Sequence, residues 1–238
     1  MKLSVIVPVY NEKDTILEVI ERVQGVSIDK EIIVVDDGST DGTREILQQM
    51  QLPSPHSYLL RGEDTGGGDI KVILKEQNKG KGSAVREGLK HAKGDVVIIQ
   101  DADLELIPED VLTLYKEWTK DFPVVYGSRF LGKNSIPLYS RFANKLLTFL
   151  TNVLFFANLT DMETCYKLCS RDILFSLHLE ANGFEIEPEI TCKILKKGFK
   201  IKEMPVNYNP RKIGKKINWK DGVKAIFCLF KYRIEKCQ

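Results

Sequence analysis

Short apolar runs alternate with amphipathic stretches along the first hundred residues. Four runs of mainly Val, Ile and Leu have the length of buried strands: 3–9, 31–35, 72–75 and 96–100. Between them, apolar residues recur at helical spacing over 12–23, 41–50 and 82–92. This alternation predicts an α/β fold with a doubly wound, mostly parallel sheet flanked by helices. Right-handed crossovers then bring the loops that follow the strands to one edge of the sheet.

The second half of the chain alternates less regularly. Its patterns predict helices over 108–120, 183–197 and 219–233, and strands over 124–127 and 200–206. A further apolar stretch over 145–159 covers a wide helical face, but about 15 residues is too short to span a bilayer. Two interpretations of this stretch stay open, a core helix and a helix that lies in a membrane interface.

Residues 52–69 interrupt the alternation with two prolines and the run Gly66-Gly67-Gly68. A triple glycine is compatible with a phosphate-binding loop, but no strand leads into it and no helix-capping pattern follows. We therefore interpret 52–69 as a flexible surface insertion.

The composition, with 43% hydrophobic and 29% charged residues, is that of a soluble globular protein. The apolar run at the N-terminus is short and ends at Pro8, which favours a strand over a signal peptide. Five cysteines in no even framework indicate a reducing, cytoplasmic compartment.

The charge is unevenly distributed, because residues 193–238 carry 14 Lys or Arg but only three Asp or Glu. Such a basic segment suits a phosphate-rich substrate or an anionic membrane surface. No motif for docking on DNA accompanies it, so we expect no nucleic-acid partner. A dinucleotide-binding Rossmann domain is excluded, since no Gly-x-Gly-x-x-Gly follows the first strand.

Carboxylates follow the predicted strand at 96–100. Asp101 and Asp103 are two residues apart, and Glu105 comes two residues later. In an open α/β sheet the ligand crevice lies at the carboxyl ends of the strands. Oxygen ligands suit Mg²⁺ or Mn²⁺, and Mg²⁺ typically binds one or two carboxylates together with substrate phosphates. The pattern therefore predicts a divalent-cation site beside a phosphate-bearing ligand.

Four segments in order carry a resemblance to a known family. They are Pro8 to Glu12, Val34 to Thr43, Asn78 to Gly82 and Asp101 to Asp103. Together they resemble family 2 glycosyltransferases, whose nucleotide-sugar domain has the GT-A fold. The resemblance covers the whole chain. It implies a single domain over 1–238, with a nucleotide-sugar-binding half at 1–107 and an acceptor-binding half at 108–238 that ends in amphipathic helices.

The second half is similar to dolichyl-phosphate (polyprenyl-phosphate) mannosyl- and glucosyltransferases. The matching segments are 127–129, 140–144, 161–167, 183–189 and 214–217. Glu105 departs from the pattern, since several relatives carry Gln there, and its added charge bears on metal preference. The loop 52–69 is longer than expected, and no transmembrane segment follows the catalytic domain as it does in many relatives.

The resemblance implies a donor-binding set: Pro8, Tyr10, Glu12, Asp36, Asp37, Lys81, Asp101 and Ala102. Asp36 would lie near the base and ribose, and Asp101 near the ribose or the sugar. Asp103, with Glu105, would hold Mg²⁺ or Mn²⁺. The alternatives are a plain turn at Asp36 and Asp37 and a solvated loop lysine at Lys81.

On the acceptor side, Arg129 and Arg141 are the expected ligands of a lipid phosphate, because a guanidinium binds phosphate in a bidentate fork. Ordinary surface charge is the alternative for both. Arg211, Lys215 and Lys216 would form a basic lid that closes over the diphosphate and excludes water.

The function implied is inverting, metal-dependent transfer of a hexose from GDP-mannose or UDP-glucose to a polyprenyl or dolichyl phosphate. We expect the protein to lie on the cytoplasmic face of a membrane, with 145–159 as its peripheral contact. One alternative keeps the donor but uses a hydroxyl acceptor, which needs a general base. Asp161 is the candidate base before Glu187, unless Asp161 caps a turn and pairs with Lys167. A third alternative is a non-catalytic nucleotide-sugar-binding subunit beside a membrane-protein partner.

Overall fold

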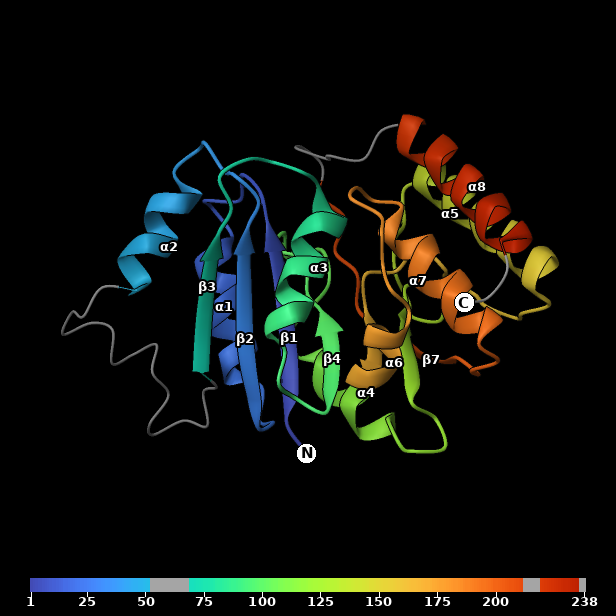
Figure 1. Ribbon diagram of the computed structural model, residues 1–238, viewed down its shortest axis with the longest axis horizontal. Coiled ribbons are helices and arrows are strands. Elements are labelled where there is room, and N and C mark those ends of the chain that lie inside the picture. Colours follow the sequence, from blue (N-terminus) through green and yellow to red (C-terminus); the bar gives the residue numbers. More distant parts are fainter. Residues whose placement is uncertain (52–68, 212–218, 236–238) are drawn as a thin grey trace.

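A seven-stranded sheet runs through the computed structural model, which describes residues 1–51, 69–211 and 219–235 (Figure 1). The strand order is β3-β2-β1-β4-β6-β5-β7. The strands are β1 (Leu3–Val9), β2 (Lys30–Asp36), β3 (Asp69–Leu74), β4 (Val96–Ile99), β5 (Val124–Ser128), β6 (Lys167–Ser170) and β7 (Lys202–Pro205). β6 is antiparallel to β4 and β5, and the other pairs are parallel. The predicted mostly parallel sheet is confirmed.

Helices flank this sheet on both sides (Figure 1). They are α1 (Ile16–Gly25), α2 (Thr43–Gln51), α3 (Lys81–His91), α4 (Asp110–Glu117), α5 (Leu138–Phe155), α6 (Arg171–Ser176), α7 (Ile186–Lys196) and α8 (Trp219–Ile234). α3 packs on β1 and β2. α5, α7 and α8 pack against one another at the opposite end of the sheet from β3.

Two hydrophobic cores account for this arrangement. In the larger core every residue of β1 and β2 is buried, which explains their unbroken apolar runs, since a strand covered on both faces has no solvent side. The smaller core lies between α5, α7 and α8 and contains Leu147, Met162, Cys192, Leu229 and Tyr232. No helix among the described residues is both long enough and apolar enough to cross a membrane.

The sequence misplaced elements mainly in the second half. α5 begins at Leu138, directly after Pro137, rather than at 145, so the segment 140–144 lies inside this helix. β6 and α6 were not predicted, because four and six residues are too few for a period to show. Of the insertion at 52–69, only Asp69 lies within the described residues, where it begins β3.

Candidate active site

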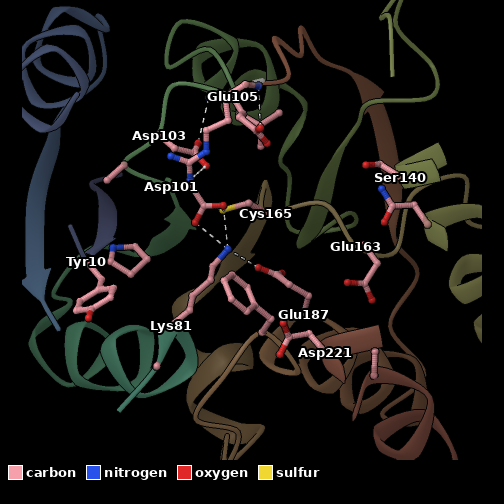
Figure 2. A pocket seen from close by; sticks show the side chains of 18 of the residues that line it. Tyr10, Lys81, Asp101, Asp103, Glu105, Ser140, Glu163, Cys165, Glu187 and Asp221 are labelled. Carbon is pink, nitrogen blue, oxygen red and sulfur yellow. Dashed lines mark hydrogen bonds and ion pairs between the residues drawn. The ribbon is translucent and has the colours of Figure 1, made fainter. Parts of the chain in front are cut away.

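A cavity of about 710 Å³ opens where the carboxyl ends of β1 and β4 meet the first turns of α5 and α8 (Figure 2). Most of the predicted site residues line it: Pro8, Tyr10, Glu12, Asp37, Lys81, Asp101, Ala102, Asp103, Glu105, Arg129 and Arg211. From the helices come Ser140 and Asn144 of α5 and Asp221 and Ala225 of α8. The cavity thus joins the charged edge of the sheet to the helices of the second core.

Glycines allow the loops at this edge to approach closely. Gly38 has a φ of +78°, and a Cβ there would lie 2.6 Å from the backbone nitrogen of Asn78. Gly80 has a φ of +97°, and its Cβ would lie 2.4 Å from the carbonyl oxygen of Asn182. A left-handed backbone with no room for a side chain requires glycine, so these positions hold three loops together around the cavity.

Asp101 and Asp103 each face a cation at the carboxyl end of β4. Lys81 Nζ lies 2.7 Å from Asp101 Oδ1, and Arg211 Nη2 lies 3.1 Å from Asp103 Oδ2. Burial raises the pKa of Asp103 to about 6, and the charges of Asp101 and Glu105 add to this rise while Arg211 opposes it. Three carboxylates, Asp101, Asp103 and Glu105, thus lie beside two cations, Lys81 and Arg211.

Arg211 bridges the two sides of this acidic edge. Its Nη1 lies 3.0 Å from Glu12 Oε1, and its backbone N–H donates to Glu105 Oε1 at 2.9 Å. The Tyr208 hydroxyl donates to Glu105 Oε2 at 3.0 Å. Glu105, expected as a metal ligand, therefore also anchors the segment that carries Arg211.

The carboxylates at this edge suit a divalent cation that is bound together with the phosphates of a ligand. They suit less well a cation that protein side chains hold alone. Within 1–51, 69–211 and 219–235, no three His, Cys, Asp or Glu side chains converge as a metal cage. Mg²⁺ needs only one or two carboxylates when phosphate oxygens complete its octahedron. Asp103 and Glu105, which line the cavity beside Asp101, present carboxylates of this kind.

Lys81 belongs to a buried row of alternating charges, as Figure 2 shows. Its Nζ lies 2.8 Å from Glu187 Oε1 as well as 2.7 Å from Asp101, and Glu187 in turn pairs with Lys167 at 2.5 Å. Burial alone would lower the pKa of Lys81, but the two carboxylates raise it well above its ordinary value. Lys81 therefore stays charged and fixes Asp101, rather than being the solvated loop lysine of the alternative interpretation.

The two aspartates that end β2 have different positions. Asp37 lines the cavity and accepts hydrogen bonds from the N–H groups of Lys79 and Gly80, at 3.0 and 2.6 Å. Asp36 is fully buried outside the lining, where Arg44 Nε donates to it at 2.9 Å and Ser39 N–H at 3.1 Å. In the described structure Asp36 therefore forms the turn with Ser39, and its expected contact with the donor base and ribose stays a prediction.

Asp161, the candidate general base, is not among the residues that line the cavity. It is fully buried, and Arg129 donates to it from Nε at 2.7 Å, from Nη2 at 2.8 Å and from its backbone N–H at 2.9 Å. The structural alternative for Asp161 named Lys167 as its partner, but Lys167 pairs with Glu187 and Asp161 pairs with Arg129. The structure thus shows Asp161 as the residue that orients Arg129, whose guanidinium also lies over the Tyr208 ring.

The remaining predicted acceptor and lid residues are not gathered at the cavity. Arg141 is exposed on α5 and is not part of the lining, although its neighbour Ser140 is. Lys215 and Lys216 lie outside the described residues. Arg129 and Arg211 are therefore the cations that the structure brings to the cavity from these two sets.

Glu163 lines the cavity, although the sequence analysis assigns it no role. Its Oε1 is buried and has no hydrogen-bond partner among the described residues. Burial raises the pKa of Glu163 to about 7, with Lys167 opposing the rise. In Figure 2 it lies near Ser140, on the side of the view away from Tyr10. Glu163 lies two residues after Asp161, in the segment 161–167 that is similar to polyprenyl-phosphate sugar transferases. The spacing of these two residues does not show which of them faces the cavity.

A comparison with protein families decides where this chain belongs. The model of the family described as "Glycosyl transferase family 2" matches residues 4–176, which hold β1 to β6 and the acidic edge. The chain belongs to glycosyl transferase family 2. The resemblance seen in the four sequence segments is thereby confirmed.

Two curated relatives show what this family 2 member is similar to in sequence. It is 29% identical over 221 residues to a dolichol-phosphate mannosyltransferase of Pyrococcus furiosus, covering 90% of this chain and 58% of the relative. It is 27% identical over 221 residues to glycosyltransferase AglJ of Haloferax volcanii, covering 91% of this chain and 66% of the relative. The chain thus spans roughly three fifths of the length of these two relatives.

Solved structures share the fold of this family 2 chain. Glucosyl-3-phosphoglycerate synthase from Mycobacterium tuberculosis in complex with UDP superposes with a TM-score of 0.68 at 21% identity, covering 98% of this chain and 80% of the other. The complex of that synthase with Mg²⁺ and UDP has a TM-score of 0.68 at 20% identity, covering 97% and 79%. The likeness confirms the expected GT-A fold.

Proposed function

We propose that this chain transfers a hexose from a nucleotide sugar, GDP-mannose or UDP-glucose, to a polyprenyl phosphate such as dolichyl phosphate. The observation that carries the proposal is the cavity itself. It connects the carboxylates of Asp101 and Asp103 to α5 and α8, whose outer faces expose apolar side chains. Membership of family 2 supports the transferase chemistry, and the relative named dolichol-phosphate mannosyltransferase supports the acceptor.

The half at 1–107 is proposed to bind the donor. Pro8, Tyr10 and Glu12 would shape the pocket for the nucleoside, and Asp101, held by Lys81, would contact the ribose or the sugar. Asp103 would hold Mg²⁺ or Mn²⁺, with Glu105 beside it. When bound, such a cation neutralises the charge that develops on the leaving diphosphate. The solved synthase in complex with Mg²⁺ and UDP supports this pairing of metal and nucleotide.

The half at 108–238 is proposed to bind the acceptor. Arg129 lines the cavity, and Asp161 takes the fork of its Nε and Nη2, so the acceptor phosphate is proposed to meet the remaining guanidinium N–H groups. A phosphate oxygen is already ionised at neutral pH, so its attack needs no general base. Attack opposite the leaving diphosphate inverts the anomeric carbon and gives a β-linked product from an α-linked donor. The burial of Asp161 outside the cavity is compatible with this acceptor.

The exposed apolar face of α5 supports the lipid acceptor over a soluble one. Within the 145–159 stretch Leu147 packs in the second core, as a core helix requires, whereas Phe149 and Val153 are 62% and 55% exposed, which supports a membrane contact. We therefore place the protein on the cytoplasmic face of a membrane, in peripheral contact with the lipid.

A second candidate function is transfer to a hydroxyl acceptor. The observation that favours it is Glu163, whose carboxylate faces the cavity with one oxygen unpartnered within the described residues. A carboxyl group with a pKa of about 7 suits a general base at neutral pH. In this alternative Glu163, rather than Asp161, is the general base.

A transfer assay separates these functions. Purified protein is offered radiolabelled GDP-mannose or UDP-glucose with Mn²⁺, with and without a short polyprenyl phosphate, and label in the organic phase is counted. Label that appears in the organic phase only when the lipid is present supports the proposal, provided that Asp103→Asn abolishes it. The control is Asp172→Asn, which should keep the label, because Asp172 is 92% exposed on α6. Donor hydrolysis without lipid labelling favours the hydroxyl acceptor. No turnover of either donor overturns both and leaves the non-catalytic subunit.

A further inference from the structure

The outer faces of α5 and α8 carry large apolar side chains. On α5 these recur at three- and four-residue spacing: Tyr139, Phe142, Leu146, Phe149 and Val153, with Phe156 directly after the helix. On α8 they are Trp219, Val223, Phe227, Phe230 and Ile234. The most exposed members include Phe156 at 88%, Ile234 at 82% and Phe227 at 72%. We call these residues the apolar face.

The apolar face is separate from the residues that hold the helices in the fold. α8 packs inward through Ala225, Cys228, Leu229 and Tyr232, which repeat on the opposite side of the helix from Phe227 and its neighbours. α5 packs inward through Leu147, Thr148 and Thr151. Each helix thus has one apolar side that builds the core and another that nothing in the described residues covers. A contiguous exposed apolar surface of this kind marks a site of protein or membrane contact.

Basic side chains border the apolar face. α5 and α8 carry six of them: Arg141, Lys145, Lys220, Lys224, Lys231 and Arg233. Lys231 pairs with Glu180, and the acidic residue of these two helices, Asp221, lines the cavity. Helices with large apolar residues and a basic border bind the headgroup region of anionic bilayers. A second copy of the chain fits less well, because a two-fold interface would bring the same basic borders together.

The cavity opens at one end of the apolar face. Its lining includes Tyr139 and Ser140 from the first turn of α5, and Trp219 and Asp221 from the first turn of α8. Tyr139 and Trp219 are also 75% and 67% exposed, so they belong both to the lining and to the apolar face. Figure 1 shows α5 and α8 side by side at the edge of the molecule. A lipid molecule whose hydrocarbon chain lies along this surface can therefore reach the cavity between the first turns of α5 and α8.

We propose that the apolar face seats the protein on an anionic lipid bilayer, with α5 and α8 lying in the headgroup layer and the mouth of the cavity at the bilayer surface. The inference rests on the proposed function for the identity of the acceptor. In this position the phosphate of a polyprenyl phosphate enters between Tyr139 and Trp219 while its hydrocarbon chain stays in the lipid. The apolar face is then both the membrane contact and the entrance for the acceptor.

Vesicle binding tests the proposal directly. The protein is sedimented with vesicles of phosphatidylcholine, alone or mixed with phosphatidylglycerol, in the absence of any nucleotide or acceptor. We expect binding to the anionic vesicles, and a loss of about tenfold for each Phe replaced in Phe149→Ser and Phe227→Ser, since burying a Phe side chain contributes roughly one to two powers of ten in affinity. Neither residue lines the cavity. The matched control is Phe122→Ser with Phe175→Ser, two phenylalanines that are 41% and 43% exposed elsewhere on the surface.

A spectroscopic readout reports the position of the cavity mouth. Trp118 and Trp219 are the two tryptophans of the chain, so Trp118→Phe leaves Trp219 as the single reporter. We expect its emission to shift to shorter wavelength on anionic vesicles and to become accessible to quenchers carried by the lipid. An unchanged emission overturns the position proposed for the cavity mouth.

Two other outcomes overturn the membrane proposal. No vesicle binding, together with a concentration-dependent dimer that Phe149→Ser and Phe227→Ser abolish, assigns the apolar face to a second copy. Vesicle binding that the control pair reduces equally removes the apolar face as its cause. Calorimetric binding of GDP and UDP with Mn²⁺ separates the membrane proposal from the proposed transferase function. Nucleotide binding without vesicle binding rejects only this inference, and vesicle binding without nucleotide binding or sugar transfer rejects only the proposed function.

Discussion

Replacing Glu163 by glutamine is expected to flatten the dependence of stability on pH. Glu163 faces the cavity, and its Oε1 is buried with no partner among the described residues. Burial raises the pKa of its carboxyl to about 7 from an ordinary value of 4.5. The folded protein therefore holds a proton here that the unfolded chain has already released at neutral pH.

The sign and size of the effect follow from this difference. Below pH 4.5 the carboxyl is protonated in both states, and the stability linked to the proton is fully present. As the pH rises through 7, the folded protein must ionise a buried group, and that stability is lost. A shift of roughly 2.5 pKa units corresponds to about 3 kcal/mol, so the wild-type protein should lose up to about 3 kcal/mol between acid and pH 8.

Urea unfolding at several pH values measures this loss. Glu163→Gln keeps the shape of the side chain but does not titrate, so the variant should be more stable than the wild type by about 3 kcal/mol at pH 8 and by less than about 1 kcal/mol at pH 5. The control is Glu45→Gln, an exposed glutamate on α2 whose replacement removes the same charge. A stability difference between Glu163→Gln and the wild type that stays constant from pH 5 to pH 8 would refute the reasoning.

Three further substitutions test the charged network. Asp161→Asn should destabilise the fold by about 3–5 kcal/mol in urea unfolding, because it leaves the Arg129 guanidinium without its buried counter-charge; a loss below about 1 kcal/mol would contradict this. Asp103→Asn should abolish transfer while nucleotide-free unfolding at pH 8 changes little or improves, since the pKa of Asp103 is raised and its charge is costly there. Arg211→Gln should bind Mn²⁺ about tenfold more tightly in calorimetry without nucleotide, because the guanidinium that competes for Glu12 and Asp103 is gone; equal affinity would show that Arg211 does not compete.

The first half of the fold could be predicted from the sequence because its signals are local. The apolar runs of β1, β2 and β4 stand between amphipathic helices, and the order of these elements determines a parallel sheet. The edge at which Asp101 and Asp103 gather follows from that topology alone. β6 gave no such signal, because its four residues pair antiparallel with strands that are distant in the sequence.

The roles of individual carboxylates could not be predicted, because they depend on side-chain direction and long-range partners. Asp36 and Asp37 are adjacent, yet Arg44 holds Asp36 in the interior while Asp37 reaches the cavity. Asp161 and Glu163 are two residues apart, yet Arg129 takes both oxygens of Asp161 and leaves Glu163 facing the cavity. In both pairs an arginine holds one carboxylate while its neighbour lines the cavity, and the spacing of the two carboxylates carries no record of that partner.

The proposed reaction requires a water-soluble substrate and a membrane-bound substrate to meet in one cavity. A nucleotide sugar is dissolved in water, whereas a polyprenyl phosphate is anchored in lipid, and the two reacting atoms must meet. The sheet edge supplies carboxylates and cations that suit the polar donor, and α5 and α8 supply an outward apolar surface that suits the lipid. Because the lining of one cavity is shared between Asp103 at the sheet and Trp219 at the helices, only the acceptor phosphate has to leave the bilayer surface. In the proposed position the hydrocarbon chain would not have to be extracted from the bilayer, which would be the advantage of building the acceptor entrance from helices that also contact the membrane.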